Sequence, residues 1–196
     1  MSTAEVVTTY TPEDLLMLPD DRAYELVDGR LVEKHMGMKS SWVAFQLGHR
    51  LQLCLDRQPA GWVLTENTFQ CFPDAPKKVR RPDVSFIRFG RLPEEELPSG
   101  HCPIAPDIAA EVVSPHDTHT EVSAKIEEYL AAGVALVWII NPDTRTVLVY
   151  REEGNTVAFL HENDELTGES VLPGFHCRVA EIFPPATPGE MVAEVK

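Results

Sequence analysis

Two short apolar segments of the sequence each carry one carboxylate, and both have the composition of a buried strand. Residues 80–86 read RRPDVSF and contain Asp83, and residues 109–114 read AAEVVS and contain Glu111. A carboxylate that is buried without a partner destabilises a protein by several kcal/mol, so it is normally found beside a cation. Two such carboxylates on strands close in sequence predict a shared cation and an active site.

The residue types predict that this cation is Mg²⁺. Side chains alternate across a strand, so Glu111 shares a face with the small residue Ala109, which leaves room beside the carboxylate. Mg²⁺ takes oxygen ligands and is commonly held by one or two carboxylates together with water and substrate phosphate. We expect Asp83 and Glu111 to bind it, with the backbone carbonyl of Val112 as a third ligand. The metal would activate a water molecule for attack on a phosphate group.

A lysine follows Glu111 on a predicted helix over residues 118–132, which Gly133 closes. Lys125 lies three residues after Val122 and four before Tyr129, and both of these belong to the apolar side of the helix. Lys125 therefore borders the buried face. From this position its ammonium group could orient the attacking water or neutralise a phosphate oxygen.

Each of the three charged side chains also has a structural interpretation. Glu121 and Glu128 stand four residues before and three residues after Lys125, so the three could form ordinary surface ion pairs. Glu111 could pair with an arginine for structural reasons alone. Asp83 could be a residue at the start of a strand that hydrogen-bonds to a nearby loop.

A strand–helix–strand unit over residues 108–140 is the predicted centre of the fold. Its two apolar strands, 108–113 and 134–140, are expected to be parallel neighbours in one sheet. An Asp-Gly pair at 28–29 predicts a hairpin before this unit, and residues 153–155 predict another after it. Together these elements predict a mixed sheet of the α/β or α+β class.

The remaining predicted elements complete this sheet and its covering layers. They are a short helix capped by Thr11, a helix from Ser40 or Ser41 to Arg57, strands over 61–64, 68–72 and 83–88, and a solvated loop over 90–106.

The overall composition predicts one cytoplasmic domain. The chain has 196 residues, of which 43% are hydrophobic, and a net charge of −14, which opposes non-specific binding to nucleic acid or anionic membrane. Four scattered cysteines fit a reducing compartment. No signal peptide is recognisable, and the longest apolar run is too short to span a membrane. We expect a flexible lead over residues 1–10 and a flexible tail over 184–196.

The ordered set of motifs resembles a large bacterial family of restriction-endonuclease-like proteins within the PD-(D/E)XK nuclease superfamily. The resemblance covers about residues 11–183. The segments that carry it are YELVDGRL at 24–31, PDVSF at 82–86, EVVSP at 111–115, Lys125 followed by YLAAGV at 129–134, VWIINP at 137–142, and LPGF at 172–175.

The resemblance implies a mixed β-sheet core flanked by helices, with Mg²⁺ or Mn²⁺ bound at Asp83 and Glu111. The superfamily signature places a lysine two residues after the glutamate, where this chain has Val113. The resemblance therefore implies that Lys125 supplies the amine from the helix. It also assigns Glu25, in the first hairpin, an auxiliary place in the site, although an exposed strand glutamate is an equally good interpretation of that residue.

DNA is the substrate that the resemblance implies, and a homodimer is the assembly that it implies. A basic run just before Asp83 is then interpreted as a set of phosphate contacts, with solvated surface charge as the alternative. Its members are Lys77, Lys78, Arg80 and Arg81.

Three functions remain open from the sequence. The first is a Mg²⁺-dependent endonuclease that hydrolyses the phosphodiester bonds of DNA. The second is a non-catalytic binding module that keeps the nuclease fold, which the net charge of −14 and the valine at position 113 favour. The third is a metal-dependent hydrolase of a small phosphorylated substrate.

Overall fold

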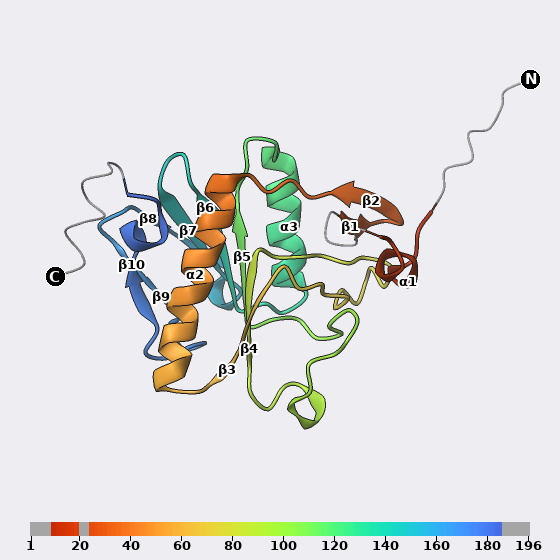
Figure 1. Cartoon of the computed structure of the whole chain (residues 1–196), viewed down its shortest axis with the longest axis horizontal. Helices are drawn as coiled ribbons and strands as arrows, with labels where there is room; N and C mark the ends of the chain where they lie inside the picture. The colour runs from red at the N-terminus through yellow and green to blue at the C-terminus, as the bar shows by residue number, and fades with distance from the viewer. Residues whose placement is uncertain (1–8, 20–23, 186–196) are drawn as a thin grey trace, which may run out of the picture.

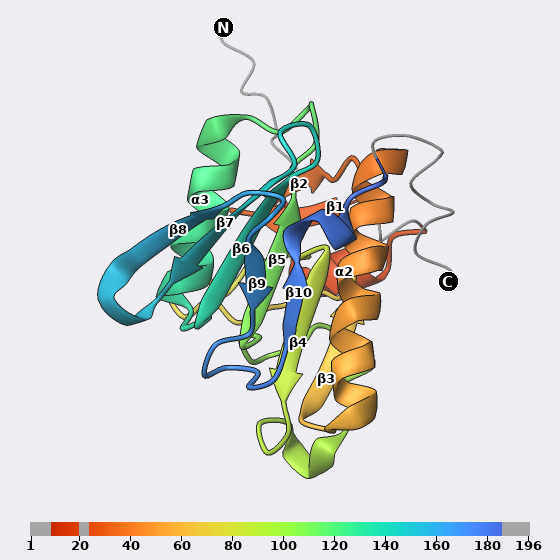
Figure 2. The same ribbon diagram turned by 90° about the vertical axis from the view of Figure 1, so that its left-hand side faces the viewer.

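A six-stranded mixed β-sheet separates two helices and divides the apolar core into two layers (Figures 1 and 2). The structure is a computed structural model, and it describes residues 9–19 and 24–185. In both views α2 runs along one face of the sheet, and α3 covers the other face. No helix in these described residues is long and apolar enough to cross a membrane.

The predicted helices and most of the predicted strands are present in the predicted order, and the structure adds two strands, β9 and β10, that the sequence did not indicate. The helices and strands, with their bounds, are α1 (Pro12–Leu16), β1 (Tyr24–Val27), β2 (Arg30–Glu33), α2 (Met38–Arg57), β3 (Gly61–Thr65), β4 (Val84–Arg88), β5 (Ile108–Val112), α3 (His119–Ala131), β6 (Leu136–Asn141), β7 (Thr146–Arg151), β8 (Thr156–Leu160), β9 (Glu165–Thr167) and β10 (His176–Arg178). Three short 3₁₀ turns add to these, namely η2 (Pro93–Glu95), η3 (Glu153–Asn155) and η4 (Val179–Ile182).

The predicted strand–helix–strand unit is present and forms the middle of the sheet. The strand order is β3-β4-β5-β6-β7-β8, and β5 and β6 are its parallel pair, while the other neighbours are antiparallel. Every residue of β5 is buried. Helix α3 connects the parallel pair. It begins with a capping box at Thr118 and is followed by Gly133 at a φ of +85°.

The two faces of β5 take different side chains, as strand alternation requires. Ala110 and Val112 face α2, whose residues Val43, Leu47 and Leu51 pack against them in the larger cluster. Ala109 lies on the opposite face, in the cluster that α3 covers. Glu111 belongs to the α3 face by the same alternation, so the sheet itself brings its carboxylate to the helix that carries Lys125.

Two predicted elements differ from the structure. Helix α2 begins at Met38 after the N-cap Gly37, and Ser40 is buried within it, so the predicted serine caps are wrong. Residues 68–72 form no strand, because Phe69 makes only isolated bridges, to Arg80 and Cys102.

The loop over residues 90–106 is also less solvated than predicted. Leu92 and Cys102 are buried and pack with Phe69 and Ile87 in a cluster of their own. The apolar contacts of these residues hold the loop against the edge of the sheet, which a count of its prolines and glycines could not indicate.

The β1–β2 hairpin lies beside the main sheet and next to α1 (Figure 1). Leu26 and Val79 exchange backbone hydrogen bonds of 2.9 and 2.8 Å, which tie β1 to the segment that leads into β4. Tyr10 donates its backbone N–H to the carbonyl of Gly29. Most of the predicted lead and tail, residues 1–8 and 186–196, lies outside the described residues.

Candidate active site

The four predicted site residues meet at the junction of the sheet, the first hairpin and α3. The Lys125 ammonium lies 3.2 Å from Glu111 Oε2 and 3.2 Å from Glu25 Oε2. Asp83 is joined to the same place through the backbone of Val112, which donates its N–H to Asp83 Oδ2 at 2.5 Å. Strands and a helix that are distant in the sequence therefore bring all of these residues together.

Asp83 lies directly before β4 and opposite the end of β5. Antiparallel pairing of Val84 with Ala110 places Asp83 beside Glu111 and Val112. Its side chain is 2% exposed. The N–H and C=O of one strand residue point to the same side, so the Val112 carbonyl also lies on the side of β5 that faces Asp83.

Two side chains of α3 hold the Glu111 carboxylate. Tyr129 donates its hydroxyl to Glu111 Oε1 at 2.7 Å, and Lys125 faces Oε2. These two residues are one helical turn apart, so they present their polar ends to the same carboxylate. The alternative in which Lys125 forms surface ion pairs is wrong. Its side chain is only 13% exposed, and Glu128 pairs with Arg80 at 2.7 Å instead.

Glu25 is buried at 2% exposure, so its interpretation as an exposed strand residue is wrong. Its Oε1 accepts the backbone N–H of Arg81 at 2.8 Å, and its Oε2 lies 2.9 Å from Arg80 Nη1. Burial alone would raise the pKa of Glu25. The charges of Lys125, Arg80 and Lys34 and the Arg81 N–H outweigh burial and lower this pKa to about 2. Glu25 is therefore a stable carboxylate at the centre of a cationic cluster.

Lys34 is a site residue that the sequence reasoning missed. Its Nζ lies 2.6 Å from Asp83 Oδ1 and 3.5 Å from Glu66 Oε1, and it donates to the carbonyl of Arg81. The signal was available in the predicted hairpin. Val32 pairs with Glu25, and Lys34, two residues further along, is expected on the same face as Glu25.

The buried carboxylates of the site favour the binding of a further cation. Burial raises the pKa of Asp83 and of Glu111, even though Lys34 and Lys125 act in the opposite direction. Burial would lower the pKa of each lysine, but the neighbouring carboxylates raise it above its ordinary value. Both amines are therefore protonated near neutral pH, and the two carboxylates still lack full compensation.

A cleft of about 570 Å³ opens beside this cluster. Lys34, Lys125, Glu25 and Arg80 are among the residues that line it, together with the first turns of α3. Asp83 and Glu111 do not line the cleft, but their partners Lys34 and Lys125 do. The positive groups that a phosphate could contact in the cleft are therefore Lys34, Lys125 and Arg80, although carboxylates also line it, namely Asp28, Glu33, Asp117, Glu121 and Glu128 besides Glu25.

Only part of the predicted basic patch lies on the surface of the protein. Arg80 and Arg81 are 5% and 4% exposed, and Arg80 is paired with Glu25 and Glu128. Lys78 also pairs with Glu128, which leaves Lys77 as the exposed member of the run. The sequence predicted phosphate contacts for this run, with solvated surface charge as the alternative. Carboxylates about 50 residues away instead pair with Lys78 and Arg80.

The donor set of the site suits a cation that keeps water ligands. No cluster of three or more His, Cys, Asp or Glu side chains in residues 9–19 and 24–185 could hold a metal ion. Two carboxylates and one backbone carbonyl are therefore the protein ligands that the site offers, which is the small set typical of Mg²⁺. Asp83 Oδ1 is buried, and among the residues that the structure describes its charged neighbour is the Lys34 ammonium at 2.6 Å.

The fold is shared with a solved nuclease-like structure. A crystal structure described as "a putative nuclease belonging to DUF820", from Anabaena variabilis, has a TM-score of 0.74 and 24% sequence identity to this chain. The match covers 88% of this chain and 97% of that one. The mixed sheet between helices therefore confirms the predicted fold class.

A family model identifies the family to which the protein belongs. The Uma2 family, described as "Putative restriction endonuclease", matches residues 12–180, and the chain belongs to this family. The predicted family is thereby confirmed. No curated protein matches the sequence.

Proposed function

We propose that this protein is a divalent-metal-dependent nuclease that hydrolyses phosphodiester bonds in DNA, with Asp83 and Glu111 as its metal ligands. The observation that carries the proposal is the buried pair of carboxylates at the β4–β5 junction. Burial raises the pKa of both of them despite two neighbouring lysines. Membership of the restriction endonuclease family supports the choice of DNA as the substrate.

The protein orients both ligands through groups that donate to the carboxylate oxygens. The Val112 N–H holds Asp83 Oδ2, and the Tyr129 hydroxyl holds Glu111 Oε1. The other oxygen of each carboxylate faces an ammonium group, Asp83 Oδ1 that of Lys34 and Glu111 Oε2 that of Lys125. Mg²⁺ or Mn²⁺ would bind these two oxygens by displacing the ammonium groups, with the Val112 carbonyl as a further ligand. When bound, the metal supplies Lewis-acid stabilisation of the charge on the phosphate.

Lys125 acts as a cation and a hydrogen-bond donor in this proposal. Burial would lower the pKa of Lys125, but the carboxylates of Glu111 and Glu25 raise it above its ordinary value, which favours the ammonium form. Its ammonium lies beside the ligand Glu111 and lines the cleft, where it can donate to a phosphate oxygen or orient the attacking water.

Glu25 is a positioning residue rather than a metal ligand. Its Oε2 contacts both Lys125 and Arg80, and its Oε1 accepts the Arg81 N–H. Both oxygens are therefore used to hold cations of the protein. Glu25 places the Lys125 ammonium between the hairpin and the sheet.

Lys34 competes with the metal for Asp83, because its ammonium lies 2.6 Å from Oδ1. The Lys34→Met variant is therefore expected to bind Mg²⁺ about tenfold to a hundredfold more tightly than the wild type. This gain in affinity corresponds to the free energy of one charged hydrogen bond. Isothermal titration calorimetry gives both dissociation constants. Mg²⁺ should also raise the melting temperature more in the variant.

The matched control for this prediction is Lys39→Met. Lys39 carries the same charge on the exposed surface, where it pairs with Asp143, so its loss should leave Mg²⁺ affinity unchanged. An affinity of Lys34→Met that equals that of the wild type, or falls below it, would contradict competition at Asp83.

The test of the proposed function is DNA cleavage by the purified protein. Supercoiled, linear and single-stranded DNA are incubated with Mg²⁺ or Mn²⁺, and parallel samples contain excess chelator. We expect strand breaks with metal and none after chelation, since the carboxylates alone supply no Lewis acid. Intact DNA in every metal-containing sample would contradict the nuclease assignment.

A non-catalytic module with the nuclease fold is the second candidate, and the two lysines favour it. Lys34 and Lys125 already place an ammonium against each carboxylate, so the site is partly neutralised without metal. Calorimetry separates the candidates, because only the nuclease requires Mg²⁺ binding that depends on Asp83.

A homodimer and a cytoplasmic location remain predictions from the sequence.

A further inference from the structure

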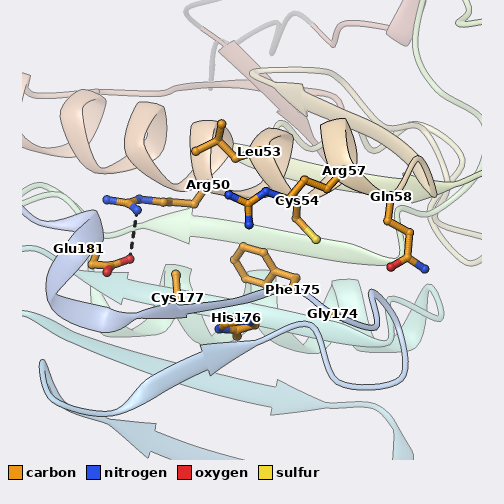
Figure 3. Close-up of a pocket in the computed structure, with 10 residues that line it drawn as sticks. All are labelled: Arg50, Leu53, Cys54, Arg57, Gln58, Gly174, Phe175, His176, Cys177 and Glu181. Atoms are coloured by element: carbon orange, nitrogen blue, oxygen red, sulfur yellow. Dashed lines mark ion pairs between the residues drawn. The ribbon is translucent and has the colours of Figure 1, made fainter.

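A second cavity, of about 260 Å³, lies between the C-terminal half of α2 and β10 (Figure 3). Arg50, Cys54 and Arg57 line it from α2 at positions i, i+4 and i+7, which form one stripe of the helix. Phe175, His176 and Glu181 are among the residues of the opposite wall. The cavity is on the α2 side of the sheet, whereas Glu111 is on the α3 side.

Arg50 has hydrogen-bond donors that the protein leaves unused. Its Nη1 lies 3.2 Å from Glu181 Oε2, the ion pair drawn in Figure 3. Its Nε is buried and has no hydrogen-bond partner in the described residues. The Arg50 side chain as a whole is 33% exposed although Nε is not, so a ligand in the cavity would contact the terminal nitrogens of the guanidinium.

Arg57 adds a second guanidinium without a counter-charge. In Figure 3 its side chain extends to the same side of α2 as that of Arg50. No carboxylate within residues 9–19 and 24–185 forms an ion pair with it. The side-chain amide of Gln58 also borders the cavity. Two guanidinium groups therefore face one carboxylate, Glu181, in a chain whose net charge is −14.

We propose that this cavity binds a small phosphate monoester, with Arg50 and Arg57 as the groups that hold the phosphate. The planar fork of arginine matches the oxygens of a phosphate and binds them in pairs. The volume is just below the range of about 300–1,000 Å³ that is typical of pockets for drug-sized ligands, so the ligand is small. Phe175 and Leu53 offer apolar contact to its organic part.

The first test is calorimetric titration of the full chain with inorganic phosphate at constant ionic strength, in excess chelator. Without divalent metal the result is independent of the proposed nuclease activity. We expect one phosphate per chain. Arg57→Gln should weaken phosphate binding about tenfold or more. This loss of affinity corresponds to the free energy of one charged hydrogen bond. Arg57 is the exposed last residue of α2, so the variant should fold.

Two further variants distinguish a built site from general charge. Arg178→Gln removes the same charge from a neighbouring exposed position that does not line the cavity, and it should leave binding unchanged. Glu181→Gln removes the carboxylate that pairs with Arg50, and it should tighten phosphate binding severalfold. A gain of affinity cannot result from misfolding. The proposal is overturned if phosphate does not bind or if Arg57→Gln and Arg178→Gln weaken phosphate binding equally. It is also overturned if Glu181→Gln fails to tighten phosphate binding.

Discussion

The Asp83→Asn variant is expected to lose both Mg²⁺ binding and DNA cleavage. Asparagine keeps the shape of the side chain and can still accept the Val112 N–H, but it removes the charge that the metal requires. Metal stabilisation of the transition state contributes several kcal/mol, so the cleavage rate should fall at least about a thousandfold. Single-turnover cleavage of a labelled duplex measures the rate, and calorimetry measures Mg²⁺ binding.

This loss is not expected to come from unfolding. Burial raises the pKa of Asp83, which means that its ionised form is unfavourable in the folded protein. Removing the charge also leaves the buried Lys34 ammonium, 2.6 Å away, without its nearest carboxylate, so the melting temperature in the absence of metal should fall, as it should in the control variant below. Mg²⁺ should raise the melting temperature of the wild type but not that of the variant.

Asp107→Asn is the matched control for Asp83→Asn. Asp107 is also a buried aspartate next to β5, but it pairs with Arg88 and Arg91 outside the candidate site. Its variant should lose stability and keep both Mg²⁺ binding and cleavage. Cleavage by Asp83→Asn at the wild-type rate would show that Asp83 is not a metal ligand, or that the activity belongs to a contaminant.

The sequence predicted that Glu111 and Lys125 lie together in the candidate site because local patterns determine that part of the fold. The apolar run of β5, the cap at Thr118 and the glycine at 133 define a strand, a helix start and a helix end. Once these are placed, alternation along the strand and the helical period bring Glu111 and Lys125 to the same layer. Geometry that repeats every two or 3.6 residues is readable without knowledge of the tertiary structure.

The rest of the site depends on pairings between distant segments. Glu25, which lies 55 and 56 residues earlier in the chain, pairs with the Arg80 guanidinium and accepts the backbone N–H of Arg81. Lys34 follows a hairpin strand and reaches Asp83 across a similar separation. No local period encodes these contacts. Strand alternation places Lys34 on the face of Glu25, but the contact of this face with Asp83 depends on the packing of the hairpin against the segment that leads into β4.

Replacement of Glu25 should strongly destabilise the fold. The Glu25→Gln variant leaves Arg80 and Lys125 buried without their shared carboxylate, and breaking a buried ion pair in this way costs about 3–5 kcal/mol. A lowering of the Glu25 pKa from its ordinary value of 4.5 to about 2 corresponds to about 3 kcal/mol. The two values agree, so the free energy of unfolding should fall by about 3 kcal/mol at neutral pH.

The pH dependence identifies the carboxylate as the cause. Because the pKa of Glu25 is lower in the folded state, its contribution is complete above pH 4.5, and it is lost as the pH falls toward about 2. The difference in unfolding free energy between wild type and Glu25→Gln should therefore be constant near neutral pH and shrink below pH 4.5. Urea unfolding at a series of pH values measures it. Glu33→Gln, an exposed change in the same hairpin, should show almost no difference at any pH. A Glu25→Gln difference that stays constant down to pH 2 would mean that lost packing, rather than lost charge, destabilises the variant.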